Sequence, residues 1–396
     1  MGKVVYFRVE FQDDKTTFFP GEIIKGIVRV MVNKELKLRG IRVEFHGEAN
    51  VFLSGGDQRR KRPANSEVYI DLVATLFGKA PDEAGENPVL APGDEYTLPF
   101  QFHIPSENLP SSVEGNFGHV RYWLRAFIDR PWRFDISTKA FFTVIEHVDI
   151  NVAPGLLHPC QVEQEEQYGW ACFSGPLSVT VQTDRGGYCP GEDIAVSAFI
   201  NNQSSSRICG VEIIFFQISV YTIKSGKRNK RRVEKVASVK RDEIQGIGDH
   251  HMEMVPLPIP SLPPTMTSCS CIKISYELKF VVHIGGWNSK DLTLTIPITI
   301  GSVPYQPLLL PSPVEPSAPP LCPPPYSDDI QPHPGVVLPS YAECVYGGAA
   351  IHDENDSGDM MGDSTFTPMY PFVNHYQIPS ATSQEPQAST SKVALP

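Results

Sequence analysis

Hydrophobic and polar residues alternate one by one in many short stretches between residues 1 and 301. Clear examples are IRVEFHG at 41–47, LSVTVQT at 177–183 and LTLTIPI at 292–298. A period of two with one apolar face is typical of an antiparallel strand that is buried on one side. Turn-forming groups such as PGE, SGG, APGDE and RGG separate these stretches, and no long segment has apolar residues at helical spacing. The pattern therefore predicts an all-β chain folded into antiparallel β-sandwiches.

The same arrangement occurs twice along these residues. FFPGEIIKGIVRVMV at 18–32 resembles GYCPGEDIAVSAFIN at 187–201, because a Pro-Gly-Glu turn precedes an apolar strand in both. Two further pairs follow in the same order: LPFQFHIP at 98–105 with PLPIP at 256–260, and YWLR at 122–125 with YELK at 276–279. A repeat spaced by roughly 150–170 residues indicates two copies of one domain rather than a solenoid of short units.

Domain boundaries follow from the repeat and from composition. Turn formers and charged residues cluster near residues 152–169, so we expect one domain at 1–152, a linker at 153–169 and a second domain at 170–301. Residues 302–396 hold 18 of the 37 prolines, one basic residue and ten acidic residues. They carry −9 of the formal net charge of −11 and predict a disordered, acidic, proline-rich tail. This distribution provides no general attraction to nucleic acid.

The sequence also suggests a cellular compartment. The N-terminus, MGKVVYFRVEF, has no apolar stretch of the signal-peptide type, and no run of about 18 apolar residues occurs anywhere. The eight cysteines are absent from residues 1–159 and irregularly spaced afterwards, which favours reduced thiols over a disulfide framework. We therefore expect a cytoplasmic protein.

A proline motif in the tail predicts a docking peptide. Pro323-Pro324-Pro325-Tyr326 fits the PPxY pattern that WW domains bind. Proline presets the polyproline II conformation, so little entropy is lost when the peptide enters an aromatic-lined groove. Pro323 and Pro324 would stack in that groove and Tyr326 would fill a second pocket. The alternative is a proline-rich spacer that ends in a tyrosine by chance.

Two weaker variants of this motif follow. Leu338-Pro339-Ser340-Tyr341 has leucine in place of the first proline and is a candidate second WW site, with Leu338, Pro339 and Tyr341 as its contact residues. Thr367-Pro368-Met369-Tyr370 is more remote. Two linked sites would matter, because the second docking event becomes intramolecular and can raise the overall affinity by roughly 10²–10⁴.

A third tail peptide precedes the PPxY motif. Pro316, Ser317, Ala318 and Pro319 resemble the P-[ST]-A-P late-domain motif, which the ubiquitin-variant domain of the ESCRT-I complex binds. The same four residues are also common in disordered linkers. Only Pro320 to Cys322 separate the two motifs, so we expect their partners to compete for space.

Two basic clusters lie at matching places in the predicted domains. They are Arg59, Arg60, Lys61 and Arg62 in the first, and Lys227, Arg228, Lys230, Arg231 and Arg232 in the second. Contact with anionic lipid headgroups or with acidic, phosphorylated cargo tails is one interpretation, at roughly 1 kcal/mol per basic residue near an anionic surface. Solvated hairpin tips are the other. Nucleic acid is not expected, because no aromatic residues are interleaved with the charges.

Motifs for catalysis and for metal binding are missing from the sequence. No G-x-S-x-G, P-loop, Rossmann glycine fingerprint or HExxH occurs, so we do not expect an enzyme. Cys269-Ser270-Cys271 and His250-His251 contain metal-binding side chains, but zinc sites usually use CxxC spacing. Strand alternation places Cys269 and Cys271 on one face, where packing is the simpler account. We therefore expect neither a metal nor another cofactor.

Several segments together resemble one family. They are the Pro-Gly-Glu turns with their strands, VRYWLRAFIDRPW at 120–132, FFTVIEHVDINV at 141–152, CFSGPLSVTV at 172–181 and ITIGSVP at 298–304. In this order, and followed by PPxY, they resemble the arrestin-domain-containing proteins, or α-arrestins. The resemblance implies two immunoglobulin-like arrestin sandwiches, one N-terminal and one C-terminal.

The resemblance also implies a function. The family is known as adaptors that join membrane receptors or transporters to WW-domain HECT-type ubiquitin ligases, which leads to ubiquitination, endocytosis and endosomal sorting. We would then expect peripheral association with the plasma membrane and endosomes. One alternative is a vesicle-budding factor that recruits ESCRT-I. Another is a thioredoxin-linked redox regulator, although the segment that matches a relative's thioredoxin-binding cysteine, Ile244–Asp249, contains no cysteine.

Overall fold

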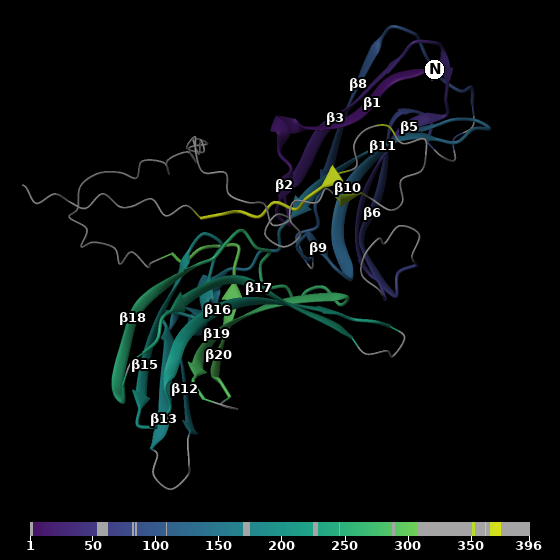
Figure 1. The fold of residues 1–396 in the computed structure, drawn as a ribbon. Helices are drawn as coiled ribbons and strands as arrows, with labels where there is room; N and C mark the ends of the chain where they lie inside the picture. Colours follow the sequence, from purple (N-terminus) through teal and green to yellow (C-terminus); the bar gives the residue numbers. More distant parts are fainter. Residues whose placement is uncertain are drawn as a thin grey trace, which may run out of the picture.

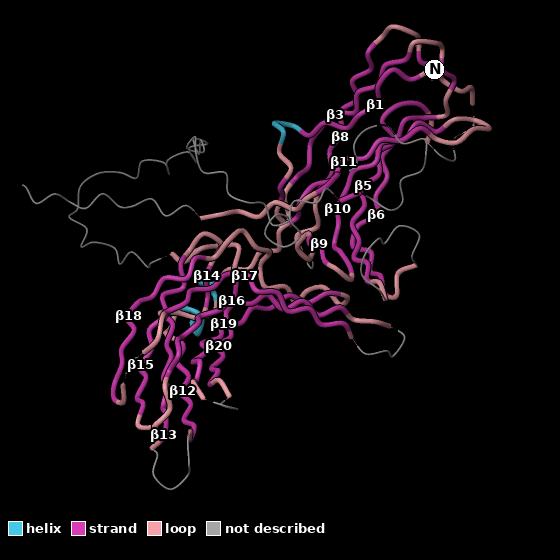
Figure 2. Tube along the Cα trace, in the orientation of Figure 1, coloured by secondary structure: helices cyan, strands magenta, loops and turns pink. Residues whose placement is uncertain are grey.

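The computed structural model covers most of the first 306 residues and a short stretch of the tail. It describes residues 3–53, 62–80, 83, 85–107, 109–168, 175–224, 229–244, 246–286, 290–306, 351–352, 361 and 365–373. Strands form almost all of the regular structure in both halves of the molecule (Figure 2). The helical pieces are three short 3-10 turns: η1 (Gln12–Asp14), η2 (Ile150–Val152) and η3 (Pro154–Leu157). In these ranges, no helix has the length and apolar character needed to cross a bilayer.

The first domain is a sandwich of two sheets that are antiparallel apart from the short parallel pair of β2 and β11 (Figure 1). One sheet has the order β1-β3-β8, formed by β1 (Val4–Phe11), β3 (Ile23–Val32) and β8 (Glu95–His103). The other has the order β2-β11-β10-β5-β6, formed by β2 (Thr17–Phe18), β11 (Ile136–Val144), β10 (Gly118–Asp129), β5 (Gly40–Val51) and β6 (Asn65–Gly78). Short β9 (Val113–Gly115) pairs with β10, and β4 (Leu36–Lys37) pairs with β7 (Val89–Leu90).

The second domain repeats this plan. One sheet has the order β12-β13-β15-β18, formed by β12 (Cys160–Gln167), β13 (Pro176–Thr183), β15 (Asp193–Asn202) and β18 (Gly248–Pro258). The other has the order β14-β20-β19-β16-β17, formed by β14 (Gly187–Tyr188), β20 (Leu292–Ile300), β19 (Ile272–Ile284), β16 (Ile208–Tyr221) and β17 (Lys230–Arg241). In the tail, β21 (Ile351–His352) pairs with β22 (Thr365–Phe366). The prediction of an all-β chain with two arrestin-type sandwiches is confirmed.

The alternation seen in the sequence builds the cores. In β3, every second side chain from Ile24 to Val32 is buried. Phe45 of β5 packs against Phe102 and Phe142, with ring centroids 5.5 and 5.7 Å apart. Burying one such ring stabilises the fold by about 1.5–3 kcal/mol. Each sandwich is thus held by the apolar faces that the sequence pattern marks.

The two Pro-Gly-Glu turns have one physical role. Gly21 and Gly191 have φ angles of +88° and +95°, a left-handed conformation that glycine adopts without strain. The glutamate that follows each glycine accepts a hydrogen bond from the backbone N–H three residues earlier, at 3.0 Å for Glu22 and 2.6 Å for Glu192. The motif therefore makes a turn in which its own glutamate accepts a backbone hydrogen bond just before a long strand begins. This explains why the motif occurs in both domains.

A buried tyrosine also occurs at the same place in each domain. The Tyr122 hydroxyl of β10 donates to the Pro110 carbonyl at 2.9 Å, and the Tyr276 hydroxyl of β19 donates to the Pro263 carbonyl at 2.6 Å. Both side chains are almost fully buried. A phenol inside a core needs an acceptor, and the carbonyl of a crossing loop provides one. The YWLR and YELK matches in the sequence thus mark equivalent structural positions.

Two stretches differ from the predicted boundaries. Residues 153–169 were expected to be a linker, but β12 lies within them and pairs along its whole length with β13. Its side chains are mostly exposed, so it lacks the apolar alternation that marks the other strands. The second stretch is the tail: residues 302–306 and 365–373 are described and contact the two domains. The ordered part of the chain therefore extends beyond residue 301.

Candidate functional site

The docking peptides predicted in the tail lie outside the described residues. They comprise Pro323, Pro324 and Tyr326, the second WW candidate Leu338, Pro339 and Tyr341, and the late-domain residues Pro316, Ser317, Ala318 and Pro319. Their binding roles stay predictions. The structure does describe one segment on each side of these peptides, residues 302–306 and 365–373. Both contact the junction of the two domains. We take this domain junction as the candidate functional site.

Each basic cluster is described only in part. Arg59, Arg60, Lys61, Lys227 and Arg228 lie outside the described residues, whereas Arg62, Lys230, Arg231 and Arg232 are described. Arg62 lies three residues before β6, and Lys230, Arg231 and Arg232 are the first residues of β17. Asn65 Nδ2 at the start of β6 donates to the Thr222 carbonyl after β16, at 3.1 Å, so these two strand ends meet at the junction. Arg232 is partly neutralised, because its Nε lies 3.1 Å from Glu234 Oε1.

Ser302 and Ser268 join the domains through Glu146. Ser302 Oγ accepts from the Val148 N–H at 2.8 Å and donates to the Glu146 carbonyl at 2.9 Å. Ser268 Oγ donates to Glu146 Oε2 at 2.8 Å. Burial raises the pKa of the Glu146 carboxyl, against the opposing effect of the Ser268 bond. Two more bonds of 2.9 Å join Asn151 to Pro304 and Gln306.

Tyr221 of β16 fits closely against the first domain. Its ring meets that of Phe117 edge to face, with centroids 5.7 Å apart. A Cβ atom on Gly115 would lie 2.1 Å from the Tyr221 hydroxyl, so only glycine permits this approach. Lys230 adds a cation contact, with Nζ 5.9 Å from the Phe117 ring centroid. The junction thus combines polar bonds on one side with an aromatic contact on the other.

A group of acid, phenol and thiol side chains occupies another part of the junction. Glu67 and Tyr69 are two residues apart on β6, so they share one face of that strand. Ser270 donates to Glu67 Oε2 through its hydroxyl at 2.7 Å and its N–H at 3.2 Å. The Tyr69 hydroxyl lies 2.7 Å from Glu67 Oε2 and 3.2 Å from Cys269 Sγ. Cys269 and Cys271 are fully buried, but they precede β19 (Ile272–Ile284) rather than lying in a strand as the sequence pattern predicted.

These contacts change the acidity of the group. Burial pushes the pKa of Glu67 upward, but the hydrogen bonds from Ser270 and Tyr69 outweigh it and leave that pKa below its ordinary value. The hydrogen bond with Cys271, supported by Tyr69 and by the Ile272 N–H, lowers the pKa of the Cys269 thiol to about 7. Sequence spacing could not have found this group, because about 200 residues separate its two halves.

A short tail segment, Met361 together with residues 365–373, packs on the first domain. The Met361 N–H donates to the Ser137 carbonyl of β11 at 2.8 Å, and the Met369 N–H donates to Thr143 Oγ1 at 3.1 Å. Phe366 stacks on Phe141, with ring centroids 5.4 Å apart. In Figure 1 this yellow segment lies beside β10 and β11. The segment thus contacts β11 at Ser137, Phe141 and Thr143.

The same segment reaches the second domain. The Tyr370 side chain is buried, and its hydroxyl donates to the Ser112 carbonyl at 2.7 Å. Ser261 Oγ of the second domain donates to the Tyr370 carbonyl at 3.3 Å, and the Val373 N–H donates to the Pro190 carbonyl at 2.8 Å. The segment is therefore bound by both domains at once. Its tyrosine is the one that the remote WW variant would need, and it is not accessible while the segment is bound.

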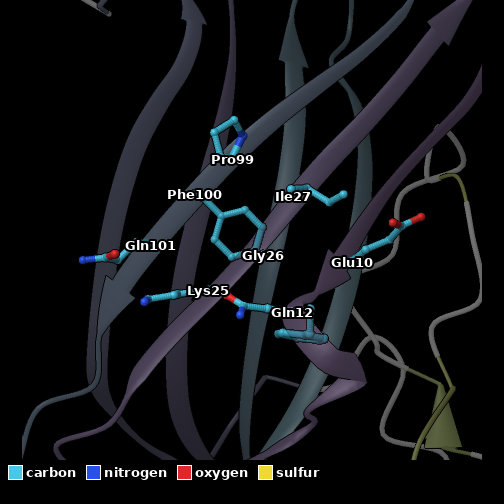
Figure 3. A pocket seen from close by; sticks show the side chains of 9 residues that line it. Glu10, Gln12, Lys25, Gly26, Ile27, Pro99, Phe100 and Gln101 are labelled. Atoms are coloured by element: carbon cyan, nitrogen blue, oxygen red, sulfur yellow. The ribbon is translucent and has the colours of Figure 1, made fainter.

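A surface depression on the first domain offers little chemistry. It has a volume of about 570 Å³ and lies over the three-stranded sheet, between Gln12, Lys25 and Pro99 (Figure 3). Glu10 and Lys25 are its charged lining residues. Glu10 Oε2 is already 2.8 Å from Arg29 Nε. Glu10, which is already paired with Arg29, and the exposed Lys25 do not form an acid–base pair for catalysis.

Comparison with known proteins supplies the context for this junction. Residues 7–151 match the family "Arrestin (or S-antigen), N-terminal domain", and residues 174–305 match "Arrestin (or S-antigen), C-terminal domain". The two matches correspond to the two sandwiches described above.

Individual relatives are similar over about three quarters of the chain. Mouse arrestin domain-containing protein 4 is 35% identical over 317 residues, which is 77% of this chain and 73% of the relative. Arrestin domain-containing protein 17 of Caenorhabditis elegans is 30% identical over 315 residues, covering 77% and 72%. Mouse thioredoxin-interacting protein is 29% identical over 303 residues, covering 76% and 74%. With two arrestin sandwiches and these relatives, the chain belongs to the α-arrestin family of arrestin-domain adaptor proteins.

Proposed function

We propose that this protein joins membrane-protein cargo to a WW-domain HECT-type ubiquitin ligase and so promotes cargo ubiquitination, endocytosis and endosomal sorting. The observation that carries the proposal is the PPxY peptide at Pro323–Tyr326, placed shortly after two sandwiches that form one joined scaffold. A scaffold of this kind supplies position rather than chemistry. The ligase supplies the reaction.

The distances along the chain support this arrangement. Gln306 is held at the junction by its N–H bond to Asn151 Oδ1, at 2.9 Å. Pro323 follows 17 residues later, so even a fully extended chain keeps it within about 60 Å of that point. A ligase bound at Tyr326 would then stay within reach of any cargo held by the sandwiches. Short tethers of this type give millimolar effective concentrations.

The basic surface at the junction is the proposed cargo or membrane contact. It comprises Arg62, Lys230, Arg231 and Arg232, together with their neighbours in the sequence Arg59, Arg60, Lys61, Lys227 and Arg228. The bond from Asn65 to Thr222 supports a single surface built from both domains. An acidic or phosphorylated cytoplasmic tail, or an anionic lipid surface, has the matching charge.

A binding titration tests the ligase link. The full chain is titrated with a four-WW ligase fragment, comparing wild type with Tyr326→Ala, Tyr341→Ala and the double variant. We expect Tyr326→Ala to weaken binding at least about tenfold, and the double variant to lose the rest, because the two peptides act together. Tyr346→Ala, a tail tyrosine without a preceding motif, is the matched control. Equal binding by wild type and the double variant would contradict the proposal.

Recruitment of ESCRT-I for vesicle budding is the second candidate, and it rests on Pro316 to Pro319. A Pro316→Ala/Pro319→Ala variant should then reduce vesicle release while leaving WW binding unchanged. Unaltered release and cargo sorting would remove this candidate. Because three residues separate the two peptides, we expect the WW fragment to compete with ESCRT-I for the wild-type chain.

A thioredoxin contact is the third candidate, and the similarity to thioredoxin-interacting protein supports it only in part. The described free cysteines include the exposed Cys209, whereas Cys189, Cys269 and Cys271 are buried. An accessible thiol is needed for a mixed disulfide. If no mixed disulfide between Cys209 and thioredoxin can be trapped under oxidising conditions, this candidate is excluded for the exposed thiol.

A further inference from the structure

We propose that Glu67, Cys269 and Cys271 form a binding site for a thiophilic divalent cation, Zn²⁺, that links the two domains. The proposal does not depend on the ligase-adaptor function. It revises the expectation of no metal, which considered only cysteines and histidines of the second domain. The third ligand, Glu67, comes from the first domain and becomes visible only in the folded chain.

Geometry is the first argument. One donor atom from each of Glu67, Cys269 and Cys271 lies within 4.8 Å of the other two. Cys271 Sγ is 3.9 Å from Glu67 Oε2. With Zn–S near 2.3 Å and Zn–O near 2.1 Å, the ligand atoms of a tetrahedral site are about 3.5–3.8 Å apart. Small side-chain adjustments would therefore bring all three donors to one ion.

Shared hydrogen bonding is the second argument. The Tyr69 hydroxyl has one proton but lies within hydrogen-bonding distance of two acceptors, Glu67 Oε2 and Cys269 Sγ. The Ile272 N–H also donates to Cys269 Sγ, at 3.2 Å. The carboxylate oxygen and the sulfur atom thus converge on one shared donor, and both keep lone pairs that can bind a cation.

Ligand type decides which cation fits. Two cysteine sulfurs and one carboxylate form a soft, mixed set that suits zinc, whereas calcium and magnesium need mostly oxygen donors. Three protein ligands leave a fourth position for water or for the Tyr69 oxygen. Ser270 is exposed between the two cysteines and gives access from solvent. It also holds Glu67 in place, as outer-shell partners do in zinc sites.

A second cluster makes a useful contrast. Glu44, His46 and Asp71 also have donor atoms close together on the first domain. Asp71 is 68% exposed, and His46 already lies 3.6–3.7 Å from the carboxylates around it. That cluster is accounted for by surface charge pairing. The thiol-containing group is different, because its cysteines are fully buried and its donors come from two domains.

The site would connect the domains directly. Glu67 lies on β6 of the first domain, and both cysteines immediately precede β19 of the second. An ion bound only by the assembled junction stabilises that assembly by mass action. We therefore expect zinc to raise the unfolding temperature of the full chain and to protect the junction from proteolysis.

Cobalt spectroscopy tests the proposal. The full-length chain is used with Cys172, Cys209, Cys322 and Cys344 replaced by serine, reduced and freed of metal. Titration with Co²⁺ should give a thiolate-to-cobalt charge-transfer band at one ion per chain, and Zn²⁺ should abolish it. Cys269→Ser and Cys271→Ser should each reduce the band and weaken binding at least about tenfold.

Glu67→Gln separates binding from folding. It leaves both thiols in place, so we expect the band to persist while the affinity for Co²⁺ and Zn²⁺ falls at least about tenfold. Glu146→Gln, at a partly buried junction carboxylate that lies outside the Glu67–Cys269–Cys271 cluster, is the matched control and should bind like the parent chain. The proposal is overturned if no charge-transfer band forms, if the band survives both cysteine substitutions, or if Glu67→Gln and Glu146→Gln bind equally.

Discussion

The two domains are alike inside and different where they meet. Each has a Pro-Gly-Glu turn capped by its own glutamate, and each has a buried tyrosine bonded to a proline carbonyl. At the junction, the first domain contributes the carboxylates Glu67 and Glu146, and the second contributes hydroxyl and thiol groups that face them. Duplication thus preserved what folds each copy, while the contact surfaces became complementary. Complementary donors and acceptors fix how the copies dock.

The largest expected effect tests whether the two cores are equivalent. Phe45 and Phe215 are fully buried on the corresponding strands β5 and β16. Phe45→Ala and Phe215→Ala should each cost about 3–5 kcal/mol, because each removes a ring from a packed core. Chemical denaturation followed by tryptophan fluorescence measures the loss. Phe134→Ala, at an 84% exposed ring, is the control and should cost less than about 0.5 kcal/mol. A loss below about 1 kcal/mol in one domain alone would contradict equivalence.

The tyrosine bonds give the next largest effect. Tyr122→Phe and Tyr276→Phe each keep the ring and leave a buried carbonyl without its donor, so each should cost about 1–3 kcal/mol. The Tyr276 bond is shorter, at 2.6 Å against 2.9 Å, and we expect the larger loss there. Thermal unfolding of both variants measures the difference. Tyr305→Phe, at a partly exposed ring, is the control, and a similar loss in that variant would refute this account.

The Pro-Gly-Glu turns separate folding from tail binding. Gly21→Ala and Gly191→Ala both place a side chain at positive φ, which costs about 1–2 kcal/mol. They differ in surroundings: a Cβ on Gly191 would lie 2.4 Å from the Val373 carbonyl oxygen, whereas a Cβ on Gly21 would have 3.6 Å to Ser106. Only Gly191→Ala should therefore release the bound tail segment, residues 365–373.

Hydrogen exchange of the tail segment measures that release. We expect faster exchange at Met369 and Val373 in Gly191→Ala, because the bonds of their N–H groups to Thr143 and Pro190 would be lost. Gly21→Ala should exchange like the wild type in this segment. The idea fails if both variants, or neither, expose the tail.

The smallest expected effect depends on pH and is confined to the first domain. His46 packs against the Trp123 ring at a tilt and faces Glu44, Glu48 and Asp71. Burial lowers the pKa of His46, but the carboxylates outweigh this effect and leave it above its ordinary value. The protonated form is thus favoured on folding. Its stabilisation is complete below about pH 6.5 and disappears as the pH rises through the folded pKa.

Strand register identifies a substitution that tests this effect. His46 is paired with Trp123 across β5 and β10, and the corresponding pair in the second domain is Phe216 with Glu277. His46→Phe should therefore reduce the difference in unfolding free energy between pH 6 and pH 8, by less than about 1 kcal/mol. Arg125, 3.5 Å from Glu44, also acts on this cluster and should be kept unchanged. An unaltered pH difference in His46→Phe would contradict the assignment.

Much of the fold could be predicted from local patterns. The stretches at 41–47, 177–183 and 292–298 are parts of β5, β13 and β20. The paired motifs mark equivalent turns and tyrosines of two domains. β12 was missed because it is an exposed edge strand, whose polar side chains give no apolar alternation. The bound tail segment was missed because prolines interrupt its few apolar residues and because it lies within an acidic, proline-rich stretch.

The sequence by itself determined the all-β class, the duplication and the candidate docking peptides, because period-two alternation and short motifs are properties of neighbouring residues. Only the tertiary structure decided that Glu67 meets Cys269 and Cys271, and that Tyr370 is buried between the domains. Those contacts depend on how the two folded domains dock. Polar groups far apart in the chain come together there because buried donors and acceptors must find partners across the junction.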